Sequence, residues 1–270
     1  MEMPSRIGKY EILDVIGINL GIVYKARDTV TGHLVALKVF GNADLTENLL
    51  REVHILGMLR HPNIVVAYEA GEFNRSTYIT MEWLDGEPLD STIRLGTPLT
   101  LLQKIDIILQ VSGALQCVHD TGMVHRDLKP HNIVLLRDGR VKLVGFHLAC
   151  LASQAIAEPG KLVGTLAFMS PEALLGQPID RRADIFSLGA TFYELVDGNW
   201  PFEGAGLQDM ATKILHEPPR RSKQAYELRL PELQAIFDKA LAKQKDLRYQ
   251  SCTEFSEDVV RLRRRLEREA

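Results

Sequence analysis

The hydrophobic pattern of the chain changes once, near residues 85–86, and this change limits the folds that it can adopt. Before it lie short β-rich runs, several separated by turn residues, at 10–16, 21–27, 34–40, 64–69 and 76–82. After it, apolar residues recur at helical spacing, most clearly in 101–121, 182–197 and 231–243. The pattern predicts an α+β fold with a small antiparallel β-rich lobe and a larger, mainly helical lobe.

One helix is expected inside the β-rich part. Residues 44–59 carry apolar side chains at helical spacing, and Pro62 follows, where a helix cannot continue. We expect a single domain over residues 1–270 that divides into an N-lobe (1–82), a hinge (83–85) and a C-lobe (86–270). A chain of this length buries enough apolar surface to fold without disulfides or a structural metal.

Composition excludes some functions. The formal charge of -3 argues against a general nucleic-acid binder, whose affinity comes largely from lysine and arginine on phosphates. The three cysteines are widely spaced, which fits a reducing compartment. No signal-like N-terminus and no apolar run that would span a bilayer is expected, so a cytoplasmic location is predicted. The arginine-rich residues 254–270 predict an amphipathic helix with a solvated face.

The side chains best suited to catalysis lie close together at residues 125–132, which read HRDLKPHN. Eight residues between two apolar segments contain an acid, two cations, an amide and a proline, which is more ionic chemistry than a short loop needs for folding. Transfer of a phosphoryl group requires an oriented hydroxyl, an acceptor for its proton and cations over the phosphates. This loop is therefore a candidate for catalysis.

Other motifs accompany the loop in a recognisable order. Residues 35–38 read VALK and end in Lys38, Glu52 lies on the expected helix, and residues 61–65 read HPNIV. With the loop at 125–132, they resemble the eukaryotic-type protein kinase domain, in particular the serine/threonine kinases of this type found in bacteria. The resemblance covers nearly the whole chain. It implies a bilobal kinase fold and transfer of the γ-phosphate of ATP to serine or threonine of a protein substrate.

The resemblance also implies roles for individual residues. Asp127 would accept the proton of the substrate hydroxyl, Lys129 would lie near the transferring phosphoryl group, and Asn132 would bind a metal ion. Lys38 would hold the α- and β-phosphates and pair with Glu52. Either of these last two residues alone would ordinarily be a surface charge, so the order of the motifs carries this assignment.

The nucleotide base would contact the N-lobe and the hinge. Met81 falls at the gatekeeper position, and residues 82–84 fall where the hinge presents backbone groups to adenine, so that Glu82 and Leu84 are candidate binding residues. The apolar positions expected on either side of the adenine ring are Val23, Ala36 and Val134. Each of these three side chains could equally be ordinary core.

Motifs in the second half complete the resemblance. Residues 164–165 and 169–172 resemble the end of the activation segment, and residues 184–189 resemble the buried helix that supports the catalytic loop. Arg248 occupies the position that usually pairs with Glu172. This pair would be structural, and its presence predicts a complete C-lobe.

The chain departs from the family pattern at the metal-binding motif. The flanking residues place this motif at 145–147, where Gly-Phe-His replaces Asp-Phe-Gly. Gly145 has no side-chain oxygen, and the imidazole of His147 is a poor ligand for Mg²⁺, which requires hard oxygen donors. Weak or absent Mg²⁺ binding is therefore expected. His147 also replaces a glycine that would permit positive φ, so a stiffer segment is expected, whereas Phe146 can still pack with Leu56 and His125.

Two further departures from the family pattern also predict an impaired kinase. Only three residues separate Gly17 from Gly21 in the expected phosphate-covering loop, and the middle glycine is absent. Residues 154–164 contain no serine or threonine, so switching by a phosphate that meets Arg126 is not expected.

Three hypotheses follow from the sequence. The first is a pseudokinase that binds ATP weakly or without Mg²⁺ and acts through a protein partner. The second is a slow but active serine/threonine kinase that uses Asn132 and one metal ion, favoured by the intact Lys38, Glu52, Asp127 and Lys129. The third is an interaction module whose nucleotide site is empty.

Overall fold

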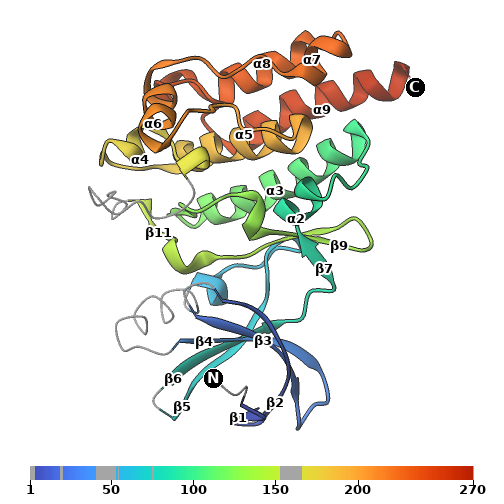
Figure 1. The fold of residues 1–270 in the computed structure, drawn as a ribbon, viewed down its shortest axis with the longest axis vertical. Coiled ribbons are helices and arrows are strands. Elements are labelled where there is room, and N and C mark those ends of the chain that lie inside the picture. The colour runs from blue at the N-terminus through green and yellow to red at the C-terminus, as the bar shows by residue number, and fades with distance from the viewer. Residues whose placement is uncertain are drawn as a thin grey trace.

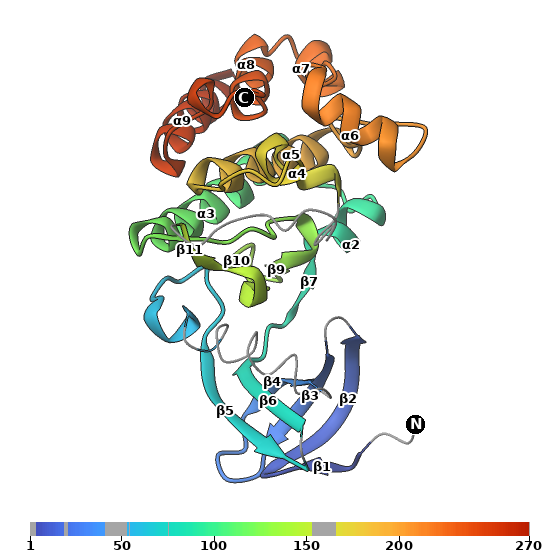
Figure 2. The ribbon, with the colours of Figure 1, turned by 90° about the vertical axis from the view of Figure 1, so that its left-hand side faces the viewer.

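The computed structural model describes residues 4–18, 21–40, 53, 55–74, 76–152 and 166–269. In Figure 1 a twisted sheet forms the lower lobe and a stack of helices forms the upper lobe, and Figure 2 shows the same two lobes from the side. The predicted bilobal α+β architecture is confirmed.

The N-lobe is built on one antiparallel sheet of strand order β1-β2-β3-β4-β6-β5. Its strands are β1 (Arg6–Ile7), β2 (Tyr10–Ile18), β3 (Ile22–Asp28), β4 (Leu34–Phe40), β5 (Ala67–Phe73) and β6 (Ser76–Glu82). Buried residues alternate along β3 and β4, as expected for a sheet with one face in the core. The runs predicted at 10–16, 21–27, 34–40 and 76–82 are therefore strands.

The strand predicted at 64–69 begins later, at Ala67. The backbone of residues 63–65 instead pairs with the C-lobe: the N–H of Leu143 donates to the Asn63 carbonyl at 2.8 Å, and the N–H of Val65 donates to the Leu143 carbonyl at 3.0 Å. Apolar residues at 64 and 65 thus join the two lobes. Of the helix predicted at 44–59, residues 53 and 55–59 are described: 53 and 55–58 are helical, and residue 59 lies past the end of the helix.

The C-lobe is mainly helical. Its helices are α2 (Leu89–Arg94), α3 (Leu101–Asp120), α4 (Pro171–Leu174), α5 (Arg181–Asp197), α6 (Leu207–His216), α7 (Lys223–Glu227), α8 (Pro231–Ala240) and α9 (Cys252–Glu269). Helix α3 begins with a capping box between Thr100 and Gln103, and α5 begins at the Asp180 cap. Helices α5 and α9 both pack on α3.

The helix predicted at 231–243 ends three residues early, at Ala240. The carbonyl groups of Ala242 and Lys243 accept hydrogen bonds from the Arg248 guanidinium at 2.7 and 3.0 Å. These carbonyls therefore have partners outside the helix, which satisfies the backbone where the chain turns.

Short strands position the residues of the candidate site between the lobes. Strands β7 (Gly86–Pro88), β9 (Ile133–Leu136) and β10 (Val141–Leu143) form a small sheet, and β8 (Met123–Val124) pairs with β11 (Cys150–Leu151). Four 3-10 turns complete the described elements: η1 (Pro130–Asn132), η2 (Phe146–Leu148), η4 (Leu166–Phe168) and η5 (Lys245–Leu247).

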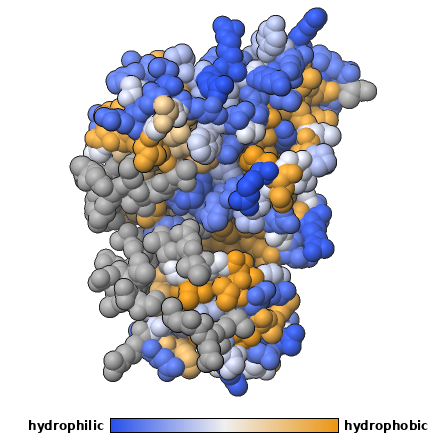
Figure 3. Space-filling model, in the orientation of Figure 1, coloured by the Kyte–Doolittle hydropathy of each residue, from blue (hydrophilic) through white to orange (hydrophobic). Residues whose placement is uncertain are grey.

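By length and composition, α3 is the one helix of the described ranges that could cross a membrane. It packs against α5, α9 and β10, and buried side chains such as Ile105, Ile108 and Leu115 have no exposed surface. Core helices of soluble proteins meet the same criterion. On the face seen in Figure 3, hydrophilic side chains cover much of the upper end of the helical lobe.

Candidate active site

The loop at 125–132 is held in place by one buried carboxylate of α5. Asp184 accepts the backbone N–H of His125 at 2.8 Å and the backbone N–H of Arg126 at 2.9 Å, and only 1% of its surface is exposed. Burial alone would raise the pKa of Asp184, but hydrogen bonds from His119 and His125 hold that pKa below its usual value. The ionised Asp184 carboxylate therefore holds the backbone of Arg126 in the left-handed region, at φ 68°.

Asp127, Lys129 and Asn132 form one hydrogen-bonded unit. The Nζ atom of Lys129 lies 2.9 Å from Oδ1 of Asp127. The Nδ2 atom of Asn132 donates to the Asp127 carbonyl at 2.7 Å and to Oδ2 of Asp127 at 2.8 Å. Asp127 and Asn132 are both buried. The structure thus brings together the three residues that the sequence predicted as catalytic.

Gly145 lies directly against Asn132. Its backbone is left-handed, with φ 81° and ψ 46°, a region that glycine adopts without strain. A Cβ atom built on Gly145 would lie 2.7 Å from both Cγ and Oδ1 of Asn132, closer than two such atoms approach. The space beside the position of the missing carboxylate is therefore partly filled by the Asn132 amide.

His147 stands where the family pattern has a glycine, but its backbone does not adopt the positive φ that a glycine would allow. It belongs to η2, and the non-glycine residues with positive φ in the described ranges are Asn74, Arg126 and Arg229. Its Nε2 atom lies 3.9 Å from Oδ2 of Asp127. A third nitrogen side chain thus faces the carboxylate that already contacts Lys129 and Asn132, a juxtaposition that the sequence did not indicate.

Phe146 is packed as the sequence predicted. Its ring meets the ring of His125 edge to face, with centroids 4.8 Å apart, and it belongs to the same hydrophobic core as Leu56. Nε2 of His125 lies 3.2 Å from the carbonyl oxygen of Val144. Burial lowers the pKa of His125, so this imidazole stays neutral in the core.

The donor set around Asn132 lacks the carboxylate that the family pattern places at position 145. Gly145 supplies no side-chain oxygen, and its neighbour Asn132 is hydrogen-bonded to Asp127. Within the described ranges, no group of three or more His, Cys, Asp or Glu side chains is placed to hold a metal ion. Magnesium usually takes one or two carboxylates together with water and phosphate oxygens.

The predicted nucleotide-binding residues of the N-lobe lie on neighbouring strands. Lys38 is buried on β4, opposite Val23 of β3, and its Nζ atom lies 4.9 Å from the ring centroid of Phe40. Ala36 pairs in register with Met81 of β6. Val134 is half-buried on β9, across the hinge. Glu52, the expected partner of Lys38, lies outside the described residues.

At the end of β6, next to the hinge, Glu82 makes an interaction that was missed from the sequence. Oε1 of Glu82 accepts from Nζ of Lys142 on β10 at 2.6 Å and from the backbone N–H of Val66 at 2.9 Å. Leu84 is half-buried and packs against the hydrophobic core that spans both lobes. The Glu82 side chain therefore links the end of β6 to β10, the strand that leads into Gly145.

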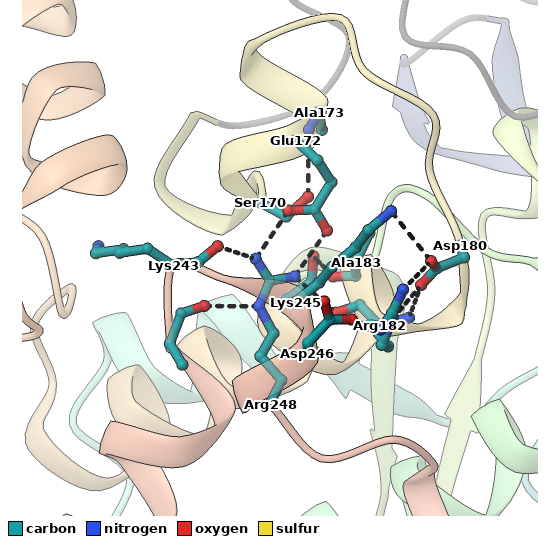
Figure 4. Close-up of polar contacts among 12 residues, drawn as sticks. Ser170, Glu172, Ala173, Asp180, Arg182, Ala183, Lys243, Lys245, Asp246 and Arg248 are labelled. Carbon is teal, nitrogen blue, oxygen red and sulfur yellow. Dashed lines mark hydrogen bonds and ion pairs between the residues drawn. The ribbon is translucent and has the colours of Figure 1, made fainter.

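The structural pair of the C-lobe is present as predicted. Figure 4 shows the Arg248 guanidinium facing the Glu172 carboxylate, with two parallel contacts of 2.7 and 2.8 Å. Both side chains are buried, and Arg248 also binds the carbonyls of Ala242 and Lys243. A bidentate arginine–carboxylate pair of this kind fixes the geometry of the elements that it joins.

Two predicted features lie partly or wholly outside the described residues. In the expected phosphate-covering loop, Gly21 has φ 136° and an added Cβ would meet the Val39 carbonyl at 2.7 Å, while residues 19 and 20 are not described. Residues 153–165 are not described either. Nη1 of Arg126 lies 3.5 Å from Sγ of Cys150.

Comparison with known proteins assigns the chain to a family. The protein kinase domain family matches residues 10–264, so this chain belongs to it. The fold and the loop at 125–132 already define that class.

Three similar proteins are bacterial serine/threonine kinases. The chain is 33% identical over 272 residues to serine/threonine-protein kinase PknB of Mycobacterium leprae, covering 96% of this chain and 44% of the relative. It is 35% identical over 274 residues to a probable serine/threonine-protein kinase of Streptomyces coelicolor (96% and 41%). It is 32% identical over 268 residues to PknA of Mycobacterium tuberculosis (95% and 62%). The chain thus spans between 41% and 62% of the length of these relatives.

Proposed function

We propose that residues 1–270 form a single pseudokinase domain, which binds ATP weakly and largely without Mg²⁺ and regulates or supports a protein partner. Kinase relatives favour a nucleotide and a protein as its ligands. The proposal assigns ATP contacts to Lys38, to the hinge and to the apolar positions on either side of the adenine ring.

The observation that carries this proposal is Gly145 packed against Asn132. A carboxylate at this position would contribute about 4 kcal/mol per unit-charge contact at an effective dielectric of about 20. Each ~1.4 kcal/mol changes a rate tenfold. Even a fraction of this loss lowers phosphoryl transfer by orders of magnitude, while the contacts of Asp127 and Lys129 stay in place.

Transfer of radiolabelled phosphate to a generic basic protein tests the proposal. With Mg²⁺ or Mn²⁺ present, we expect the wild-type protein and the Asp127→Asn variant to give the same background. Turnover in the wild type that disappears in Asp127→Asn would contradict it, because the variant removes the proposed proton acceptor together with its charge beside Lys129.

A second candidate function is a slow, active serine/threonine kinase. It is favoured by the hydrogen-bonded unit of Asp127, Lys129 and Asn132, whose residues are those that phosphoryl transfer needs. In this case Gly145→Asp should raise a rate that is already detectable in the wild type. An undetectable wild-type rate would count against this candidate.

A site that binds no nucleotide is the third alternative. Ligand binding to the folded state alone stabilises it by RT ln(1 + [L]/Kd). A reproducible rise in melting temperature with ATP therefore favours the pseudokinase with a nucleotide, and no rise at millimolar ATP favours an interaction module.

A further inference from the structure

The catalytic-loop anchor Asp184 is connected to the last helix of the domain. His119, on α3, places Nε2 at 2.8 Å from Oδ2 of Asp184. The other ring nitrogen, Nδ1, lies 3.6 Å from Sγ of Cys252, the first residue of α9. All three side chains are buried, and the oxygen Oδ2 that meets His119 also accepts the N–H of His125.

We propose that Cys252 is a positioning residue for the catalytic loop, because its thiol fixes the tautomer of His119 that supports Asp184. The assignment concerns the C-lobe and does not depend on the proposed loss of metal binding. Its failure and the failure of the proposed function are therefore separate outcomes.

The donor and acceptor roles follow from chemistry. Asp184 is ionised and accepts only, so Nε2 of His119 must carry the hydrogen. Burial raises the pKa of Cys252, so its sulfur keeps its proton, and in the proposed arrangement this proton points to Nδ1 at 3.6 Å. The sequence of hydrogen bonds then runs from the thiol to the imidazole, from the imidazole to the carboxylate, and from the two loop amides to the same carboxylate.

Further contacts keep the start of α9 on α3. Oγ of Ser112 donates to the Cys252 carbonyl at 3.0 Å, and Oγ of Ser256 donates to Oγ of Ser112 at 2.8 Å. Helix α9 lies beside α3 in Figures 1 and 2. The position of the thiol is thus fixed by the docking of α9, and a displacement of α9 would remove the partner of Nδ1.

A matched control exists on α3. Cys117 has its Sγ 4.0 Å from the Arg60 carbonyl and is not part of these contacts. It lines the same surface pocket of about 510 Å³ as Cys252. Cys117→Ala and Cys252→Ala therefore make the same chemical change beside the same pocket, and only the second removes the partner of His119.

The test uses ¹⁵N-histidine NMR and amide hydrogen exchange on the whole chain, with His119 assigned from His119→Gln. In the wild type we expect a protonated Nε2 and a bare Nδ1. In Cys252→Ala, relative to Cys117→Ala, we expect the Nδ1 signal to shift. Exchange of the His125 and Arg126 amides should rise about fivefold, the factor that corresponds to one ordinary buried hydrogen bond.

Three results would overturn the assignment. A wild-type His119 with its hydrogen on Nδ1, or doubly protonated at neutral pH, contradicts the proposed tautomer and needs no variant to fold. A Nδ1 signal unchanged in Cys252→Ala contradicts the contact. Equal amide exchange in the two alanine variants contradicts the effect on the loop.

Discussion

The two sides of the catalytic loop differ in what they have kept. On the C-lobe side, Asp184 and the Glu172–Arg248 pair are buried, ionic and fully hydrogen-bonded. On the opposite side, Gly145 brings no charge, and its neighbour Asn132 bonds to Asp127. The contrast teaches that the scaffold contacts of a kinase domain can be kept where a carboxylate of the family's metal motif is absent, because different side chains provide the two.

The largest effect is expected where the scaffold is broken. Arg248→Ala leaves Glu172 as a buried, unpaired charge and removes the contacts to Ala242 and Lys243. We expect a loss of about 3–5 kcal/mol in the free energy of unfolding, measured with urea. Arg220→Ala is the control, because its ion pair with Glu203 is solvent-exposed and should be worth at most ~1 kcal/mol. Equal losses in the two variants would refute the assigned role of Arg248.

Acid should weaken the same side of the site. The folded-state pKa of Asp184 is lowered, so its contribution is present above the unfolded value of about 3.9 and is lost as the pH falls through the folded-state pKa. We expect the acid limb of the unfolding free energy to be less steep in Asp184→Asn, which has lost this group. Parallel acid limbs in the wild type and Asp184→Asn would show that the carboxylate is not stabilised by folding.

A smaller effect is expected on the metal side. In Gly145→Ala the new Cβ meets Asn132 and takes a left-handed backbone that L-residues rarely adopt. We expect a destabilisation of about 1–3 kcal/mol by urea unfolding, together with NMR shifts at Asn132 and Asp127. Gly139→Ala is a control for backbone strain alone, since its φ is 84° and nothing lies within 4 Å of the added atom. Equal losses at both positions would mean that Asn132 does not fill the gap.

The smallest effect is expected at the other altered position of the motif. His147 lies in η2 without positive φ, so His147→Gly relieves no strain and gives a modest loss of about 0.5–1 kcal/mol from backbone entropy. A gain in stability by urea unfolding would instead indicate that the histidine is strained in a position built for glycine.

Much of the fold could be predicted from the sequence, because hydrophobic periodicity specifies strands and helices wherever they are amphipathic. The β-rich runs and α9 follow this rule, whereas α5 is buried on nearly every side. The interlobe pairing of residues 63–65 with Leu143 could not be predicted, because a short apolar run does not reveal which segment its backbone will pair with. The early end of α8 depends on Arg248, which contributes from eight residues further along the chain.

The candidate site was predicted by motif order more than by local pattern. Asp127, Lys129, Asn132 and the Glu172–Arg248 pair lie together as expected. The Glu82–Lys142 contact was missed because residues 60 apart gave no signal of their proximity. The packing of Asn132 against Gly145 was likewise hidden, because it depends on backbone dihedral angles that no single sequence reveals.

Thermal unfolding with millimolar ATP, in EDTA and in Mg²⁺, tests the central claim most directly. If the metal side is lost while the nucleotide residues remain, ATP should raise the melting temperature by a similar, small amount in both conditions. A rise that appears only with Mg²⁺, or is much larger with it, would show that the site still holds the metal–nucleotide complex and would contradict the account.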